Sequence, residues 1–160
     1  YALTNDTLAI AARQGTLHRN FQGYTTGSEL DLLGVGPTAI SQYPNLFSQN
    51  LADLKAYTHT LEEGRLPVER GLVVVDPDVL ERRDLIKNLM CTFALSFDIK
   101  RFDQEWLDLQ HLALDGLVEL HSEGSNGHVQ VTNQGRWLIR TVASVFDTNQ
   151  SLHSKSSRLV

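Results

Sequence analysis

The sequence predicts an α+β protein whose second half is a small module of helices and one β-hairpin. Residues 76–95 and 103–115 place apolar side chains at helical spacing, and each segment opens with an aspartate that can cap a helix. Residues 117–121 and 128–132 alternate in polarity around a tip rich in Gly and Ser, which is the pattern of a hairpin. With a last helix over residues 132–146, the order is helix, helix, hairpin, helix, which indicates a winged-helix-like module.

Capping signals support these helices. Asp76-Pro77 combines an N-cap acid with a proline at the first helical position, where the missing N–H costs nothing. Asp103 is expected to cap the next helix, and Gly116 to end it. Thr132 or Asn133 is expected to cap the last one. Four side chains of the last helix are expected to face inward: Leu138, Val142, Val145 and Phe146.

The first half is organised around a glycine-bearing stretch, residues 18–41. It holds Gly23, Gly27, Gly34 and Gly36, four of the eleven glycines in the chain. A strand is expected at Asp31–Val35, with helices before and after the stretch over residues 7–14 and 51–63. Glycines beside a buried strand often mark a place where backbone approaches another strand or a ligand. Any chemistry of this chain is therefore expected to touch residues 18–41.

Composition and charge limit the function classes. Hydrophobic residues make up 41% and charged residues 21%, which is typical of a globular protein. The net charge of −5 is spread over both halves, so neither half has the basic face that nucleic acid or an anionic membrane requires. The second helix of the module carries Asp103, Glu105, Asp108 and Asp115 and no Lys or Arg, which argues against DNA binding.

Metal, thiol and targeting signals are few. The single cysteine, Cys91, excludes an internal disulfide, suits a reducing cytoplasm, and lies in an apolar helical run where a buried inert thiol is expected. His121 and His128 flank the hairpin and are expected to form a solvated pair rather than a zinc site. No metal ligand and no catalytic residue is assigned. No apolar run reaches membrane-spanning length. The chain begins at Tyr1 rather than Met, so we expect it to be part of a longer protein.

Two segments carry a family resemblance: HRNFQGYTT at residues 18–26 and DLLGVGPTAIS at residues 31–41. They resemble the closing part of the catalytic domain in the oxygen-independent coproporphyrinogen III oxidase family, radical S-adenosylmethionine (SAM) enzymes of haem synthesis. The resemblance continues through RGLVVVDPDVLERRDLIKNLMCTF and VQVTNQGRWLIRTVASVFDT to the end of the chain. It implies that residues 1–70 are the last segment of a partial (β/α) barrel. Residues 71–160 would then form a mostly helical, winged-helix-like C-terminal domain.

The resemblance implies an oxidoreductase that decarboxylates two propionates of coproporphyrinogen III and yields protoporphyrinogen IX. Such enzymes use S-adenosylmethionine and a four-iron, four-sulfur (4Fe-4S) cluster held by three cysteines at C-x-x-x-C-x-x-C spacing. With Cys91 alone, the chain cannot supply that motif. We therefore expect it to bind neither group and to be inactive by itself. The parent protein is expected to be a monomer that binds the porphyrinogen, whereas the isolated chain is expected to self-associate through an exposed barrel edge.

Site residues follow from the resemblance, position by position. Cofactor contacts are carried over to Phe21 and Gln22 in the NFQG run and to Ile40 near the end of the second segment. Ordinary core packing is the alternative for Phe21 and Ile40, and an exposed turn amide for Gln22. The substrate bears four carboxylates, for which arginine is the natural partner, so Arg19 and then Arg70 are candidates for substrate binding.

Further candidates and alternatives stay open. Arg82 and Arg83 are weaker candidates for substrate binding, because ion pairs on a helix surface would account for both. A related haem-binding or haem-chaperone radical SAM homologue would share the same motifs without the oxidase activity. A stand-alone winged-helix regulator is the third interpretation, which the acidic second helix disfavours.

Overall fold

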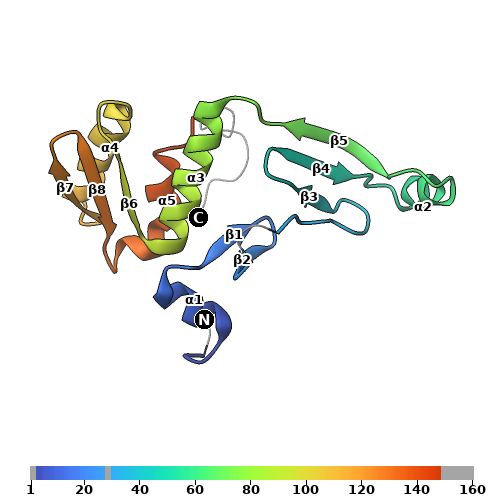
Figure 1. Cartoon of the computed structure of the whole chain (residues 1–160), viewed down its shortest axis with the longest axis horizontal. Helices are drawn as coiled ribbons and strands as arrows, with labels where there is room; N and C mark the ends of the chain where they lie inside the picture. The colour runs from blue at the N-terminus through green and yellow to red at the C-terminus, as the bar shows by residue number, and fades with distance from the viewer. Residues whose placement is uncertain (1–2, 28–29, 149–160) are drawn as a thin grey trace. The chain divides into compact units, whose positions relative to one another are not determined.

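The computed structural model describes residues 3–27 and 30–148 (Figure 1). Its contacts divide the chain into two compact units, Tyr1–Leu80 and Glu81–Val160. Each unit combines helices with small antiparallel sheets, as expected for an α+β protein. The division falls inside helix α3 (Pro77–Thr92), which begins in the first unit and continues into the second. None of the described helices is long and apolar enough to cross a membrane.

The first unit begins with α1 (Thr7–Gln14), which confirms the helix expected there. The Asp6 side chain accepts the Leu8 N–H at 2.8 Å and caps the helix, and Gly15 ends it in the left-handed region at φ 70°. The elements that follow are β1 (His18–Asn20), β2 (Gly23–Thr25), β3 (Ile40–Gln42), β4 (Leu46–Asn50), α2 (Leu54–Glu62) and β5 (Val68–Val73). Strands β1 and β2 form a hairpin, and β3, β4 and β5 form a three-stranded antiparallel sheet.

The prediction of a strand at Asp31–Val35 is wrong. Within this range only Leu32 makes a bridge, an isolated one to Gln42, and Val35 is 82% exposed. The physical reason lies in Gly34 and Gly36. The second of these has φ 108°, which turns the chain, and both bond to side chains instead of to a neighbouring strand. The first strand of the three-stranded sheet, β3, begins at Ile40.

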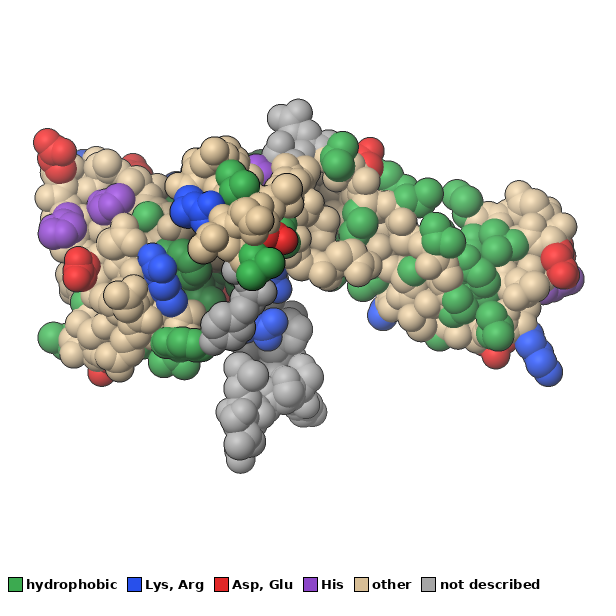
Figure 2. Space-filling view, turned by 90° about the horizontal axis from the view of Figure 1, so that it is seen from below, with side chains coloured by type: hydrophobic (Ala, Val, Ile, Leu, Met, Phe, Trp, Pro, Cys, Tyr) green, Lys and Arg blue, Asp and Glu red, His purple; other side chains and the backbone are tan. Residues whose placement is uncertain are grey.

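Strand β5 forms one edge of this sheet and pairs only with β4 among the described strands. All six of its residues are exposed. Further hydrophobic side chains gather on the surface of the first unit at the end that carries α2 (Figure 2). Exposed hydrophobic residues of α2, of the segment after it and of the loop bonded to it include Leu33, Val35, Leu54, Leu61 and Leu66.

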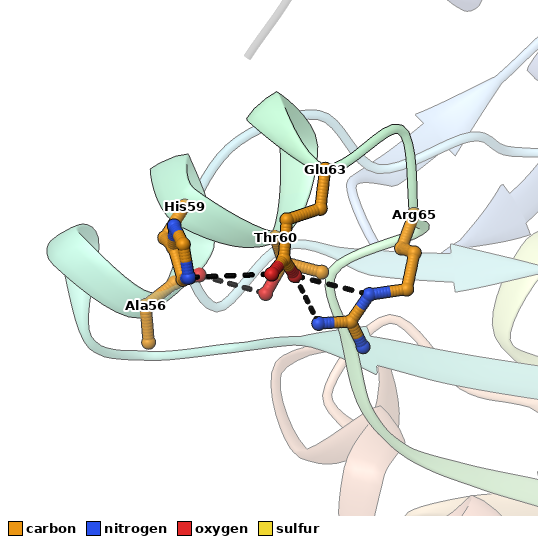
Figure 3. Close-up of polar contacts among 5 residues, drawn as sticks. All are labelled: Ala56, His59, Thr60, Glu63 and Arg65. Atoms are coloured by element: carbon orange, nitrogen blue, oxygen red, sulfur yellow. Dashed lines mark hydrogen bonds and ion pairs between the residues drawn. The ribbon is translucent and has the colours of Figure 1, made fainter.

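Helix α2 is capped by Asp53, whose carboxylate accepts the Ala56 N–H at 2.8 Å. At its far end Glu63 accepts from Arg65 and lies 3.4 Å from His59 Nε2 (Figure 3). The Thr60 hydroxyl donates back to the Ala56 carbonyl at 2.8 Å. The side chains of His59, Glu63 and Arg65 are exposed to solvent, so their ion pairs contribute little stability. Their arrangement shows His59 as a helix-end partner rather than a metal ligand.

The second unit places two helices and a short C-terminal helical segment on one three-stranded sheet. After α3 its elements are β6 (Ala94–Asp98), α4 (Asp103–Leu114), β7 (Val118–Glu123), β8 (Asn126–Val131), the 3-10 helix η1 (Gly135–Leu138) and α5 (Ile139–Ser144). The strand order is β6-β8-β7, all antiparallel. The predicted hairpin is confirmed, with Gly124 and Ser125 at its tip.

Helix α3 ends at Thr92, short of the expected Leu95. Phe93 adopts φ 61°, which breaks the helix, and the next residues alternate between buried and exposed positions as strand β6. Leu95 and Phe97 thereby enter the core from a strand. The apolar spacing of residues 89–97 fits either a helix or a strand, which is why the pattern alone misplaced the boundary.

Two other details at helix ends differ from expectation. Asp103 is the first residue of α4 rather than its cap, which is Phe102, although Gly116 ends the helix as expected at φ 73°. The last helix begins as η1, where the Thr132 hydroxyl accepts the Gly135 N–H at 3.0 Å. Because a 3-10 helix has fewer residues per turn than an α-helix, Leu138 rotates out to 48% exposure instead of facing inward.

The core of the second unit is aromatic at its centre. Phe97 meets Phe146 edge-on at a ring distance of 5.3 Å and Phe102 at 6.0 Å, and Trp106 packs against Phe97 from the side. Leu89, Leu109, Val129 and Val142 are fully buried around them. Both tryptophans of the chain, Trp106 and Trp137, belong to this unit, so tryptophan fluorescence reports on its unfolding.

We predict that Phe146→Ala lowers the free energy of unfolding of the second unit by about 3–5 kcal/mol, because it opens a cavity beside the rings of Phe97 and Phe102. Urea denaturation followed by tryptophan fluorescence measures this loss. Leu114→Ala is the control, since Leu114 is 86% exposed; it should change the unfolding free energy by less than about 0.5 kcal/mol. Equal effects of the two substitutions would contradict the assigned core.

Candidate functional site

The Gly34-Val35-Gly36 loop is held by side chains of the neighbouring elements. Asn50 at the end of β4 is buried, and its amide donates to the carbonyls of Gly34 at 3.1 Å and Gly36 at 3.0 Å. The Gly34 N–H donates to the Ser41 hydroxyl at 3.0 Å, and the Gly36 N–H donates to the Tyr57 hydroxyl at the same distance. The loop is therefore fixed to β3, β4 and α2 without forming a strand.

Glycine is required at position 34. A Cβ there would lie 2.7 Å from the Ile40 carbonyl oxygen, so any side chain would push the loop away from the start of β3. Between the loop and β3, Thr38 adopts φ 60°, a strained value for a β-branched residue, and its N–H donates to the Leu51 carbonyl at 3.0 Å. The close backbone approach that the glycines indicated occurs at this point, and it fixes where Ile40 begins the sheet.

One face of the three-stranded sheet carries a groove of about 170 Å³. The register places Ile40, Gln49 and Arg70 in one row across the strands, and Phe47 opposite Leu72 two residues further along, on the same face. The groove is lined by Phe21, Ile40, Phe47, Ser48, Gln49, Arg70, Gly71 and Leu72. Its lining is apolar apart from Ser48, Gln49 and Arg70.

Phe21, in the turn between β1 and β2, forms the side of the groove that the three-stranded sheet does not form. The Phe21 ring meets Phe47 edge-on, with ring centroids 5.5 Å apart. The Phe21 N–H donates to the Gln42 side chain at 3.3 Å, which ties the turn to β3. Phe21 remains 58% exposed, so it is a surface aromatic on a groove and not a core residue.

The structure brings together three of the five residues predicted for binding. Phe21, Ile40 and Arg70 line the same groove. Gln22 does not line it; its backbone N–H donates to the Asn20 side chain at 2.8 Å in the tight turn after β1. Arg19 stacks over the Tyr24 ring on the neighbouring strand, 5.6 Å from its centroid, and also lies outside the lining.

Sequence reasoning missed Gln49, which contacts Arg70 directly. The Arg70 Nε and Nη2 atoms both donate to the Gln49 side-chain oxygen, at 2.9 and 2.5 Å. The Gln49 amide nitrogen in turn donates to the Thr38 carbonyl at 3.2 Å. Leu46 to Gln49 are all of intermediate burial, and the LFSQN sequence of β4 does not alternate in polarity, so no sequence signal indicated that Phe47 and Gln49 share a face.

The arginines of α3 have structural partners. Arg82 forms an ion pair with Glu105 at 2.5 Å, and both side chains are mostly buried. Arg83 lies 3.8 Å from Asp84. Close by, burial and the Arg83 charge lower the pKa of Lys87. The sequence favoured ion pairs on the surface of a single helix for Arg82 and Arg83. The Arg82 partner instead lies on another helix, α4, and that pair is mostly buried.

The described residues offer no metal centre. No group of three or more His, Cys, Asp or Glu side chains among them could hold a metal ion. Cys91 is a buried free thiol on α3. His121 and His128 are direct partners across β7 and β8, and His128 Nδ1 lies 2.9 Å from the Ser96 hydroxyl. A larger depression of about 670 Å³ beside α4 and β7 is lined by His121 but by none of the residues predicted to bind cofactor or substrate.

Known proteins related to this chain were found by sequence and by structure. No family model matches the chain. It is 41% identical to the oxygen-independent coproporphyrinogen III oxidase of Pseudomonas aeruginosa over 92% of this chain and 33% of that protein. Against the enzyme of the same name from Synechocystis it is 41% identical over the whole chain and 37% of that protein.

A solved structure agrees with these relatives. Coproporphyrinogen III oxidase from Escherichia coli, described as a radical SAM enzyme, superposes with a TM-score of 0.80 and is 40% identical. The match covers 92% of this chain and 35% of the E. coli chain. The chain thus spans about a third of the length of these relatives. The resemblance read from HRNFQGYTT and DLLGVGPTAIS is confirmed.

We predict that Asn50→Ala lowers the free energy of unfolding of the first unit by about 2–3 kcal/mol, because two loop carbonyls lose buried donors. Asn50→Asp keeps the volume but turns an oxygen toward those carbonyls, so it should cost at least as much. Hydrogen exchange of the β3 and β4 amides measures the loss. Asn20→Ala removes one exposed bond and should cost about 1 kcal/mol or less. Unchanged exchange in both Asn50 variants would contradict the anchoring role.

Proposed function

We propose that this chain, a homologue of a C-terminal part of oxygen-independent coproporphyrinogen III oxidase, serves in a radical SAM enzyme of haem synthesis. The reaction is the oxidative decarboxylation of coproporphyrinogen III to protoporphyrinogen IX. The carrying observation is sequence identity of about 41% over 92–100% of the chain, together with a fold match at the same level of identity. The groove that unites Phe21, Ile40 and Arg70 supports the same proposal.

The groove suits part of an S-adenosylmethionine molecule. Phe21, Ile40 and Phe47 offer flat and branched apolar surface to an adenine ring or a methylene chain, and Gln22 lies beside Phe21 in the turn. A volume of about 170 Å³ is smaller than the roughly 300 Å³ at which sites for drug-sized ligands begin. The remaining walls of a cofactor site would come from other parts of the parent protein.

The residues of this chain do not fit the 4Fe-4S cluster. Such a cluster is bound by several thiolates, and Cys91 is the only cysteine here, buried on α3. The cluster ligands would have to lie elsewhere in the parent enzyme, and S-adenosylmethionine bound there would supply the radical chemistry. Within the parent enzyme, the residues of this chain would help to bind and orient S-adenosylmethionine and the substrate.

Substrate binding is proposed for Arg70 and, outside the groove, for Arg19. A guanidinium group pairs with a carboxylate through two parallel hydrogen bonds, and coproporphyrinogen III carries four carboxylates. Arg70 lines the groove, whereas Arg19 stands on β1 against Tyr24. The apolar lining beside Arg70 would accommodate the carbon frame next to such a carboxylate.

We also propose the larger architecture. Residues 1–70 would be the last segment of a partial (β/α) barrel, and residues 71–160 a winged-helix-like C-terminal domain in which β7 and β8 form the wing. The order α3, β6, α4, β7, β8 supports the second assignment. The parent enzyme would be a cytoplasmic monomer. The exposed edge strand β5 would be covered in the parent and would allow the isolated chain to self-associate.

We predict that Ile40→Ala in the full-length enzyme raises the KM for S-adenosylmethionine about tenfold, because it removes apolar surface worth about 0.8 kcal/mol per buried methylene. Steady-state assay of coproporphyrinogen decarboxylation measures the change. Leu66→Ala, at a side chain 82% exposed in the same unit, is the control and should leave KM unchanged. An enzyme that binds haem and shows no decarboxylation would instead support the haem-chaperone alternative.

We predict that the chain alone acquires no 4Fe-4S cluster when it is incubated anaerobically with iron, sulfide and reductant, because it offers one buried thiol. Visible absorption and iron analysis after desalting measure the outcome. The full-length enzyme, treated in parallel, should retain about four irons per chain, the content of one cluster. A stable cluster on the isolated chain would show that other residues can serve as ligands.

A further inference from the structure

We propose that Gln49 is a positioning residue that holds Arg70 at the edge of the groove as a receptor for a ligand carboxylate. The inference deepens the proposed function and rests on it for the identity of the ligand. Its own support is the set of contacts around Gln49 and Arg70. The inference assigns a role to Gln49, which neither the family motifs nor the predicted arginine contacts had indicated.

The first support is the way in which Arg70 is held. Both Nε and Nη2 donate to the single Gln49 side-chain oxygen, at 2.9 and 2.5 Å, so one edge of the guanidinium fork is fixed. Arg70 and Gln49 are also direct partners in the β4–β5 register. The remaining donors of the guanidinium are not used by any described side chain.

The second support is the charge of Arg70, which no neighbouring acid balances. Within the described part of the chain, no carboxylate lies at ion-pair distance from Arg70. Other arginines do have such partners: Arg65 with Glu63, Arg82 with Glu105, and Arg101 with Glu81. A neutral amide orients Arg70 without neutralising it, and this leaves a full positive charge for an incoming anion.

The third support is that the orientation of the Gln49 amide is determined. Its nitrogen donates to the Thr38 carbonyl at 3.2 Å while its oxygen accepts from Arg70. A flipped amide would place N–H groups against the guanidinium and an oxygen against the carbonyl, and both contacts would be repulsive. Thr38 is itself fixed at φ 60° between the glycine loop and β3. Arg70 is therefore positioned through Gln49 by the backbone that places Ile40.

The fourth support is the surface beside the charge. Phe21, Ile40, Phe47 and Leu72 line the same groove, so the site suits a ligand with an apolar body and a carboxylate. Two ligands of the proposed function have this chemistry. One is the amino-acid end of S-adenosylmethionine, and the other is a propionate of the porphyrinogen. The experiment below separates them.

The test follows the arginine Nε–H resonances of the intact chain by NMR during titration with propionate, with neutral propionamide as the matched control ligand. Propionate should shift the Arg70 resonance saturably and propionamide should not. The Arg101 resonance, from a guanidinium paired with Glu81, should move less and serves as the internal reference. An Arg70 resonance that ignores propionate would overturn the proposal.

Variants then test the positioning role. Gln49→Leu should weaken propionate binding about fivefold to tenfold, the effect of losing the orientation of one charge-assisted hydrogen bond. Gln49→Glu should weaken it further, because its carboxylate pairs with Arg70 and repels the ligand. Arg70→Lys keeps the positive charge but loses the paired N–H donors of the guanidinium, so it should bind propionate more weakly than the unsubstituted chain. Unchanged affinity in folded Gln49→Leu and Gln49→Glu would mean that Arg70 needs no positioning, and the inference would fail.

Larger probes identify the carboxylate. These probes are titrated into the full-length enzyme, because the groove of this chain is too small to hold a whole cofactor. If the binding of S-adenosylhomocysteine depends on Gln49, and the binding of methylthioadenosine, which lacks the amino-acid part, does not, the site receives the cofactor. Gln49-dependent binding of coproporphyrin III, the stable oxidised porphyrin, would assign it to the substrate. Propionate binding that depends on Gln49, with neither large probe bound, would support this inference and count against the proposed function of the groove. If the large probes bind with equal affinity to the unsubstituted protein and to Gln49→Leu, the result would support the proposed function of the groove and overturn the role of Gln49.

Discussion

The buried amide of Asn50 fixes the geometry of the first unit. Its two hydrogen bonds hold the carbonyls of Gly34 and Gly36 against the end of β4, where no strand could satisfy them. With the loop in that place, Gly34 touches the backbone of Ile40 and sets where β3 begins. The row of Ile40, Gln49 and Arg70 follows from that start through the strand register. Because a buried amide is costly to leave without partners, the arrangement is specified as well as stabilised.

The two faces of the β3–β4–β5 sheet contact different parts of the structure: one binds the glycine loop, and the other lines the groove. Ser41 and Asn50 are buried and bind the glycine loop, while Phe47, Gln49 and Arg70 belong to the alternate positions that line the groove. Polar groups on the first face are satisfied within the chain. On the second face a cationic group stands among apolar side chains without an acidic partner in the described residues. Such an imbalance is expected where a ligand, rather than the protein, completes the contacts.

The two units differ in how much of their hydrophobic surface they bury. The second unit closes around a complete aromatic and aliphatic core. The first leaves Leu66, Leu72 and Val75 exposed, and its edge strand β5 is exposed along its whole length. The relatives are about three times as long as this chain, so an unfinished surface is consistent with its proposed place in a larger enzyme. Its groove is likewise too small to hold a whole cofactor.

The helices with strong caps, the hairpin at residues 118–131 and the resemblance to coproporphyrinogen III oxidases could be read from the sequence alone, because capping chemistry, alternation and motifs are local signals. Tertiary structure decided which strands formed from short segments that fit two patterns. Leu95 and Phe97 became strand residues because Phe93 breaks the helix, and Asp31–Val35 became a loop because side chains distant in sequence satisfy its backbone. It also brought Phe21 and Arg70 into one groove, since strand register joins residues that sequence spacing cannot relate.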